Sequence, residues 1–506
     1  MSQGVLPFQY EKEASVSGLT ALAGLPIWLD LGVAAGLFTS LRTHVGVRAG
    51  GKQGWTDAQM VLSLVLLNLA GGGCVDDLRI LEGDEGFVRV LRRLELKALG
   101  VPRQRQREME RRWRGERKRV VPSPSAVFRY LSAFHDPEEE KKREEGKAFI
   151  PAPNEHLCSL GRVNRDLVKF AQDKSNQTVA TLDMDATLVE SHKREALFSY
   201  KGFKGYQPLN AYWFEQDLVV HSEFRDGNVP AGYQQLRVFQ DALKTLPEGV
   251  SEVFLRSDTA GYQWELMRYC AESRNERFGK IGFAIGADVT PEFKQAVARV
   301  EEGEWHPLCR EVKGQQVATG QEWAEVCFVP NGMGHKKHGP EYRFLAIREP
   351  LGQLTLPGME PEQLSFPNME FGKTRHKLSG VVTNREIPGQ ELIRWYRGRC
   401  GKSEGVHAIM KEELAGGQLP SGDFGENAAW WAIMILALNL NALMRRLVLP
   451  KAWTNSRLKA IRFGLINVAG RVVEHARKLL VRLSGTHPHA DLLIGLRERI
   501  LALGYP

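Results

Sequence analysis

Residues 179–189 read VATLDMDATLV, and this short stretch decides the expected fold class. Apolar and β-branched side chains alternate with acidic ones, which predicts a β-strand. Asp183 and Asp185 are two residues apart, so both carboxylates face the same side of that strand. They are the first candidate site residues, and strand periodicity alone does not choose between them.

The segments that follow predict a mixed α/β layer. Two further strands with short turns come first, and helices and strands then alternate. The expected strands are 206–216, 217–225, 252–258 and 279–288, and the expected helices are 232–246 and 262–273. Three neighbouring strands followed by helix–strand alternation indicate one sheet covered by helices. This is the order expected of a ribonuclease-H-like core, although several α/β folds begin in a similar way.

The pattern of apolar and polar residues changes on both sides of this layer. For a chain of 506 residues, this change predicts several domains. Residues 293–388 contain strand-like segments joined by turns rich in Gly and Pro, which predicts a β-rich insertion into the core. A long helix is expected from about Gln390 to Leu414 and ends at two glycines. Five regions are expected: a helical DNA-binding or dimerisation region (1–172), the first part of the core (173–292), a β-rich insertion (293–388), the catalytic helix of the core (389–420) and a basic helical C-terminal region (421–506).

Positive charge is concentrated in two places, which favours a polyanionic partner such as DNA. The chain carries a net charge of +8. Residues 103–119 contain nine basic and three acidic residues, and residues 445–506 contain twelve and three. A short helix capped by Ser123 or Ser125 follows the first cluster and is expected to present Arg129 and Tyr130. A basic run beside a short helix suits a helix-turn-helix reader of DNA.

Cysteine usage and hydropathy favour a cytosolic protein. The six cysteines are dispersed without a CxxC pair, so neither a disulfide scaffold nor a cysteine-type zinc site is expected. No secretory signal is evident at the N-terminus. The most apolar stretch, 428–444, is short and contains two asparagines, which predicts a buried helix and no membrane partner.

Two more acidic residues complete a candidate metal site. Asp258 ends the strand EVFLRSD just before a helix, where α/β sheets place their sites. Glu404 lies in the helix after the insertion, and Arg397 and Lys411 fall on the same stripe of an uninterrupted helix. Carboxylates from two strands and one helix suit two Mg²⁺ ions that activate a nucleophile and stabilise a leaving oxygen in phosphoryl transfer.

Three blocks of sequence resemble a known family. TLDMDATLVESH, LRSDTAGYQWELMRYC and IRWYRGRCGKSEGVHAIMKEELAGG resemble the catalytic blocks of DDE transposases from bacterial insertion sequences. The similarity is greatest to the thirteen-eighty family, which is related to the piggyBac elements. The blocks WTDAQMVLSLVLLNLAGGGCVDDLRIL and LPSGDFGENAAWWAIMILALNL also resemble that family, so the resemblance covers residues from about 15 to 480.

The resemblance implies a function and roles for individual residues. It makes Asp185, Asp258 and Glu404 the catalytic ligands of Mg²⁺ or Mn²⁺, with two ions expected. It implies binding to terminal inverted repeats, cut-and-paste transfer of DNA, TTAA-like target sites and a homodimer in the synaptic complex. A bacterial, nucleoid-associated cytosolic location follows.

The same resemblance implies that Tyr396, Arg399 and Lys411 bind DNA phosphates around Glu404, although Arg399 lies one residue further from Glu404 than in the family pattern. Helix geometry makes Arg397 the alternative DNA-binding arginine. On an uninterrupted helix Arg397 points toward the site and Arg399 away from it. Gly398 and Gly401 allow a later helix start that would free Arg399. Which of the two arginines contacts DNA stays open.

The same residues are compatible with other functions. LDMDATLV also resembles the first motif of haloacid-dehalogenase-like phosphatases, with Asp183 as nucleophile and Asp185 as acid/base. A transposase-derived protein that binds DNA without cutting it, and an ordinary nuclease of the ribonuclease-H type, are further alternatives. The phosphatase reading explains neither Glu404 nor the two basic clusters.

Overall fold

The structure is a computed structural model that describes residues 17–48, 54–97, 101–113, 118–312, 314–330, 342–352, 366–476 and 478–504. The chain forms two compact units, each built from separate stretches. The first unit contains residues up to 137, 153–167 and those from 409 onward. The second unit contains residues 138–152 and 168–408.

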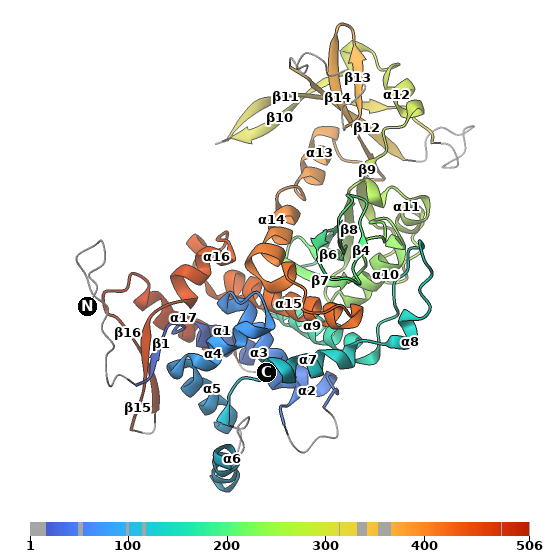
Figure 1. Cartoon of the computed structure of the whole chain (residues 1–506). Coiled ribbons are helices and arrows are strands. Elements are labelled where there is room, and N and C mark those ends of the chain that lie inside the picture. Colours follow the sequence, from blue (N-terminus) through green and yellow to red (C-terminus); the bar gives the residue numbers. More distant parts are fainter. Residues whose placement is uncertain are drawn as a thin grey trace, which may run out of the picture. The chain divides into compact units, whose positions relative to one another are not determined.

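The first unit is mainly helical (Figure 1). Its helices include α1 (Leu25–Ala34), α2 (Leu37–His44), α3 (Asp57–Ala70), α4 (Leu78–Gly83), α5 (Glu85–Lys97), α6 (Val101–Trp113), α7 (Pro124–Leu131), α15 (Phe424–Leu443), α16 (Leu458–Ile461), α17 (Ala490–Ala502) and the first part of α9 (Glu155–Lys174). Helix α3 begins as expected, because Thr56 and Gln59 form a reciprocal capping box. It ends at Gly71, whose φ of 97° is the left-handed conformation that favours glycine.

Helix α15 is the central helix of this unit. Nineteen of its twenty residues are buried, and it packs against α1, α3 and α7. The segment Phe424–Val448 is long and apolar enough to cross a membrane, yet 94% of its apolar window is buried inside the protein. The prediction of a buried helix is therefore confirmed.

The C-terminal region differs from the expected all-helical structure. Strands β15 (Gly470–His475) and β16 (Lys478–Leu483) form an antiparallel hairpin, and β1 (Leu19–Thr20) pairs with β15. The hairpin contacts the N-terminal part of the chain, because Val472 is buried and its backbone amide donates a hydrogen bond to the Gly18 carbonyl at 2.7 Å. The hairpin depends on a partner more than 400 residues away in sequence, which local periodicity does not reveal.

The second unit is built on a mixed ten-stranded sheet. Its strands are β2 (Val179–Ala186), β6 (Leu209–Trp213), β7 (Leu218–Glu223), β8 (Glu252–Ser257), β9 (Gly282–Ala287), β10 (His306–Val312), β11 (Gln315–Val326), β12 (Arg343–Pro350), β13 (Asn368–Phe371) and β14 (Thr374–Thr383). The order along the sheet is β10-β11-β12-β14-β9-β8-β2-β6-β7, and β13 pairs with β14. Helices α10 (Gln235–Thr245) and α11 (Trp264–Ala271) connect the strands of its core part.

Pairing directions around β2 determine which strand ends meet. Strands β2 and β6 are antiparallel, as are β6 and β7, whereas β2 and β8 are parallel and β8 and β9 are parallel. The predicted α/β class with its three neighbouring strands is confirmed. Because β2 and β8 run in the same direction, their carboxyl ends lie at one edge of the sheet.

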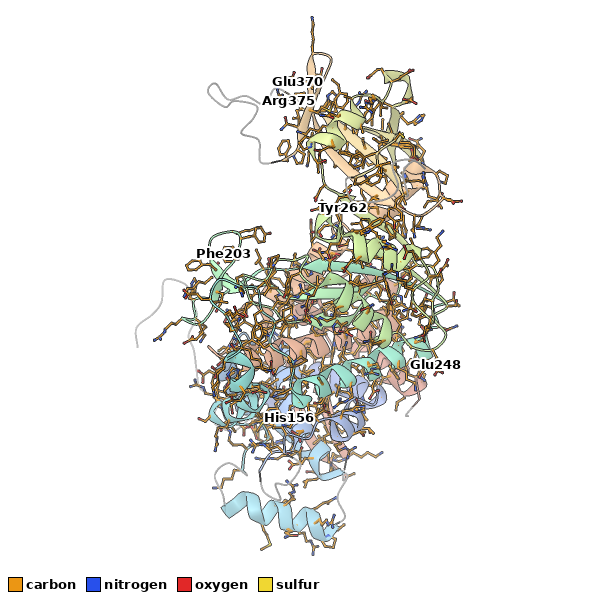
Figure 2. The ribbon with its side chains drawn as sticks, turned by 90° about the vertical axis from the view of Figure 1, so that its right-hand side faces the viewer. His156, Phe203, Glu248, Tyr262, Glu370 and Arg375 are labelled. Carbon is orange, nitrogen blue, oxygen red and sulfur yellow. The ribbon has the colours of Figure 1, made fainter. Side chains whose placement is uncertain are left out.

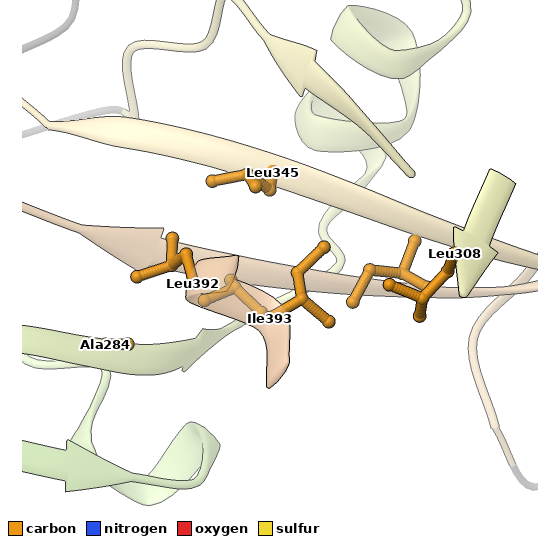
Figure 3. Close-up of a cluster of buried hydrophobic side chains, with 7 residues drawn as sticks. Ala284, Leu308, Leu345, Leu392 and Ile393 are labelled. Carbon is orange, nitrogen blue, oxygen red and sulfur yellow. The ribbon is translucent and has the colours of Figure 1, made fainter. Parts of the chain in front are cut away.

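The insertion is not a separate sheet, because it extends the core sheet. Strand β14 pairs antiparallel with β9, and β12 pairs with β14. Figure 3 shows the apolar cluster that fastens this extension: Ala284 of β9, Leu308 of β10 and Leu345 of β12 pack against Leu392 and Ile393. The last two residues belong to α13 (Gly389–Arg397), which therefore covers one face of the extended sheet.

The long helix expected from Gln390 to Leu414 is interrupted. Helix α13 stops at Arg397, a turn covers 398–401, and α14 (Lys402–Ala408) begins after it. Gly401 has a φ of +77°, a conformation that ordinary residues adopt at a cost. Because of this interruption, Arg397 and Glu404 do not lie on one continuous helical face, so the directions of Arg397 and Arg399 differ from those of an uninterrupted helix.

Candidate active site

The parallel pairing of β2 with β8 brings two of the three candidate carboxylates together. Residues Asp183 and Met184 lie opposite Arg256 and Ser257, so the next position places Asp185 beside Asp258 at the carboxyl ends of both strands. Asp258 keeps an extended backbone and then caps a short 3-10 helix by accepting from the amide of Ala260 at 3.1 Å. Asp185 and Asp258 therefore share one face of one sheet edge.

One step below this pair lies a buried ion pair that the sequence analysis missed. Arg256 donates from Nε and Nη2 to the two carboxylate oxygens of Asp183, at 2.6 and 2.8 Å. Both side chains are at most 1% exposed. Nη1 of Arg256 also donates to the carbonyl of Trp395 in α13 (2.6 Å), and its guanidinium lies over the rings of Phe214 and Trp395. Arg256 thus joins β2 to the end of α13.

A pattern in the sequence carried this information. Arg256 precedes Asp258 by two residues, just as Asp183 precedes Asp185, so the two strands carry matched pairs. In the β2–β8 register, Asp183 lies opposite Arg256, so these two side chains have opposite charges. Asp185 and Asp258 follow at the strand ends and have like charges. Burial raises the pKa of Asp183, and the bonds from Arg256 oppose that rise.

The helix interruption decides which arginine enters the site. Nη2 of Arg399 lies 3.4 Å from Oδ2 of Asp185, and the Arg399 side chain is 10% exposed. Arg397 is turned to the insertion instead, where its Nη1 donates to Oε1 of Gln321 at 2.6 Å. The helix is interrupted, as Gly398 and Gly401 allowed, so the orientation of an uninterrupted helix does not apply and Arg399 lies toward β2. Within the described residues, nothing accepts a hydrogen bond from the buried Nε of Arg399.

Tyr396 lies beside Arg399 and packs on β9. The Arg399 guanidinium is 5.9 Å from the centre of the Tyr396 ring. A side chain on Gly286 would meet the Tyr396 hydroxyl at 3.0 Å, so the absence of one lets the tyrosine approach the strand. Burial raises the pKa of Tyr396 to about 12, which keeps the hydroxyl protonated as a hydrogen-bond donor near neutral pH.

Glu404 is exposed on α14, and α14 reaches the same sheet edge through a neighbouring residue. His407 is three residues after Glu404, and its Nε2 lies 3.3 Å from Nδ2 of Asn210. Asn210 of β6 lies directly opposite Asp185 in the β2–β6 register. In the part of the chain that the structure describes, no group of three or more His, Cys, Asp or Glu side chains is arranged to hold a metal ion. The structure thus assembles two of the three candidate ligands.

The chemistry of Asp185 and Asp258 fits a divalent cation. Both supply carboxylate oxygens, the ligands that Mg²⁺ and Mn²⁺ prefer. The pKa of Asp185 is raised to about 6, chiefly by burial; Arg399 opposes the rise, and the charges of Asp258 and Asp183 add to it. A cation between the two carboxylates would relieve this repulsion. Residues Asp185 and Asp258 would hold such an ion, with Glu404 available on α14.

The other predicted DNA-binding residues lie in the first unit. Ser123 caps α7 as expected and Arg129 is exposed, but Tyr130 is fully buried, so its expected presentation on the surface is wrong. Helix α6 carries much of the first basic cluster, of which residues 114–117 lie outside the described residues. Lys411 falls in a π-helical turn, Ile409–Glu413, of this unit. Its role beside Glu404 remains a prediction.

Part of the C-terminal basic cluster has a structural use. Arg462 donates to the carbonyls of Asn68 and Leu69, at 3.0 and 2.9 Å, and so fastens the end of α3. Arg457 forms an ion pair with the buried Glu413. Lys478 and Arg482 are exposed on β16. The positive charge available to a ligand is therefore smaller than the sequence count.

The chain is similar to proteins of one known family. Residues 47–505 match the family model described as "Transposase DDE domain group 1". The chain belongs to this transposase family. A solved structure of the piggyBac transposase in a synaptic complex with hairpin DNA is similar to this transposase, with 11% sequence identity, a TM-score of 0.46, and coverage of 89% of this chain and 81% of that one. No curated protein matches the sequence.

The phosphatase reading of this transposase is contradicted by the position of Asp183. A nucleophile needs access to its substrate, whereas the Asp183 carboxylate is completely buried and both its oxygens are bonded to Arg256. Asp185, which is 22% exposed, is the accessible carboxylate of the two. The structure thus distinguishes two carboxylates that strand periodicity left equivalent, and the catalytic role of Asp185 remains a prediction.

Proposed function

We propose that this transposase binds the inverted-repeat ends of a mobile element and performs metal-dependent strand cleavage and transfer in a cut-and-paste reaction. Asp185, Asp258 and Glu404 are the proposed ligands of Mg²⁺ or Mn²⁺. The observation that carries the proposal is the β2–β8 register: Met184 lies opposite Ser257, so Asp185 and Asp258 follow at the same sheet edge, while Asp183 is buried in an ion pair with Arg256. Membership of the transposase family supports the same reading.

The core part of the sheet is proposed to be ribonuclease-H-like. Three antiparallel strands are followed by two parallel ones in the order β7-β6-β2-β8-β9, with α10 and α11 in the connections. This order supports the assignment. It also explains why the two aspartates come from β2 and β8, which are neighbours in the sheet although 73 residues separate Asp185 from Asp258.

The residues around the carboxylates have distinct proposed tasks. When bound, the metal would activate the attacking water or 3′-hydroxyl and stabilise the leaving oxygen. The Arg399 guanidinium, whose Nη2 lies 3.4 Å from Oδ2 of Asp185, is proposed to bind a phosphate oxygen of the strand being cut. The Tyr396 hydroxyl is a second donor beside it. The Asp183–Arg256 pair holds β2, β8 and α13 in the register that these contacts need.

Glu404 must approach the two aspartates for this chemistry, and α14 is the proposed means. Its neighbour His407 already contacts Asn210, which lies across from Asp185. A rotation of the exposed Glu404 side chain, or a small movement of α14 on binding DNA and metal, would complete the ligand set. The proposed partners are double-stranded DNA and a second copy of the chain in a synaptic homodimer.

Incubation of the full chain with labelled candidate element ends and Mg²⁺ tests the proposal. The expected products are strands with new 3′-hydroxyl ends that become joined to target DNA. Omission of the metal, or an Asp258→Asn change, should abolish both products while end binding persists. Binding without any cleavage would instead support a transposase-derived DNA-binding protein, and cleavage without joining would support an ordinary nuclease.

A further inference from the structure

A small aromatic arm rises from the same sheet edge as Asp185. The arm comprises residues 189–206 and contains the three-stranded sheet β3 (Val189–Glu190), β5 (Lys204–Tyr206) and β4 (Leu197–Phe198). It leaves the end of β2 four residues after Asp185 and returns to the start of β6, just before Asn210. Figure 2 shows the arm, with Phe203 labelled, standing out from the second unit.

The arm exposes two large aromatic side chains. Phe198 is 63% exposed and Tyr200 is 74% exposed. Both stand beside cations, because Nζ of Lys204 lies 5.7 Å from the Phe198 ring centre and Nζ of Lys201 lies 5.9 Å from that of Tyr200. Residues 189–206 contain four lysines or arginines and two acidic residues. The surface is thus aromatic and positively charged.

The foot of the arm is closely packed although its tip is exposed. Tyr206 is buried and stacks on Phe224 with 4.9 Å between ring centres. Gly205 approaches Val189 so closely that a side chain there would lie 2.2 Å from the Val189 carbonyl oxygen. At the tip, the amide of Ser199 donates to the Phe203 carbonyl at 2.8 Å. A pre-ordered tip loses little conformational freedom when it binds a ligand.

We propose that this arm stacks on unpaired bases of the DNA next to the strand that is cut. The inference rests on the proposed function and adds a base-binding site to it. Exposed aromatic rings stack on bases of any sequence, and adjacent cations attract the phosphates. In an intact duplex the base faces already stack on one another, so Phe198 and Tyr200 gain this contact only where bases are unpaired. Because the arm begins four residues after Asp185, at the end of β2, we expect that contact to lie close to the reacting end.

The test compares two labelled probes bound to the full chain at fixed salt: a blunt duplex, and the same duplex with one end opened into unpaired strands. The double variant Phe198→Ala with Tyr200→Ala should lose at least about fivefold affinity for the open-ended probe, the smaller end of the stabilisation from one stacked base. Its affinity for the blunt duplex should stay unchanged. Tyr200→Phe keeps an aromatic face and should bind both probes like the parent.

The matched control is Ile494→Ala, which removes another exposed apolar side chain, 61% exposed, on α17 of the first unit. It should change neither affinity. Equal losses on both probes, or no loss on either, would overturn the arm proposal. So would a shift of the double variant to a smaller oligomer in light scattering, because the arm would then bind a second copy of the chain. If the parent binds neither probe, the proposed function itself fails.

Discussion

Replacing Asp183 with alanine should destabilise the second unit far more than replacing Asp185. Arg256 would stay buried at 1% exposure and lose charged hydrogen bonds of 2.6 and 2.8 Å. Breaking a buried ion pair by removing one partner costs about 3–5 kcal/mol. Because the Trp395 carbonyl still accepts from Arg256, we expect a loss of about 3 kcal/mol in the free energy of unfolding.

Urea titration followed by amide hydrogen exchange in β2 and β8 would measure this loss and assign it to the sheet. Asp185→Ala is the control and should change the unfolding free energy by less than about 1 kcal/mol, since its side chain is partly exposed. The double change Asp183→Leu with Arg256→Met removes both charges and should be more stable than Asp183→Ala alone. A double variant no more stable than the single one, or a single loss below about 1 kcal/mol, would refute the reasoning.

Three other predictions follow from the site and the basic clusters. Since the pKa of Asp185 is raised to about 6, protons should compete with the metal for this carboxylate below pH 6. Mn²⁺ affinity, measured by electron paramagnetic resonance, should therefore fall about tenfold for each pH unit below 6 and stay constant above pH 6. Arg399→Ala should lower the strand-cleavage rate about 10²-fold, whereas Arg397→Ala should lower it much less, because only Arg399 faces Asp185; similar losses would contradict this assignment. Neutralising Lys478 and Arg482 should reduce the salt dependence of DNA binding by about one unit of slope per lost phosphate contact, and an unchanged slope would show that β16 only faces solvent.

The sequence predicted the strands of the core and left the role of each carboxylate open. Alternation placed Asp183 and Asp185 on one face, and it could not show that Arg256 neutralises the first of them. That distinction depends on the register between two strands about 70 residues apart. Register is set by long-range pairing and packing, which a local pattern does not contain.

The departures from expectation have similar causes. Gly398 and Gly401 signalled an interruption of the long helix, but only its actual geometry shows that Arg399 turns toward Asp185 and Arg397 toward Gln321. The C-terminal hairpin pairs with Leu19–Thr20, a partner from the opposite end of the chain. The insertion was expected as β-rich, and its continuity with the core sheet through β14 and β9 emerges only in three dimensions.

Strand cleavage by a Glu404→Gln protein tests the central claim most directly. Glu404 is the one proposed ligand whose side chain is exposed, and the substitution keeps its size while removing its charge. The full chain, shown to be folded and to bind element ends like the parent, would be incubated with labelled ends and Mg²⁺. Loss of cleavage and joining with end binding intact is the predicted result. Cleavage at the parent rate would contradict the three-carboxylate site.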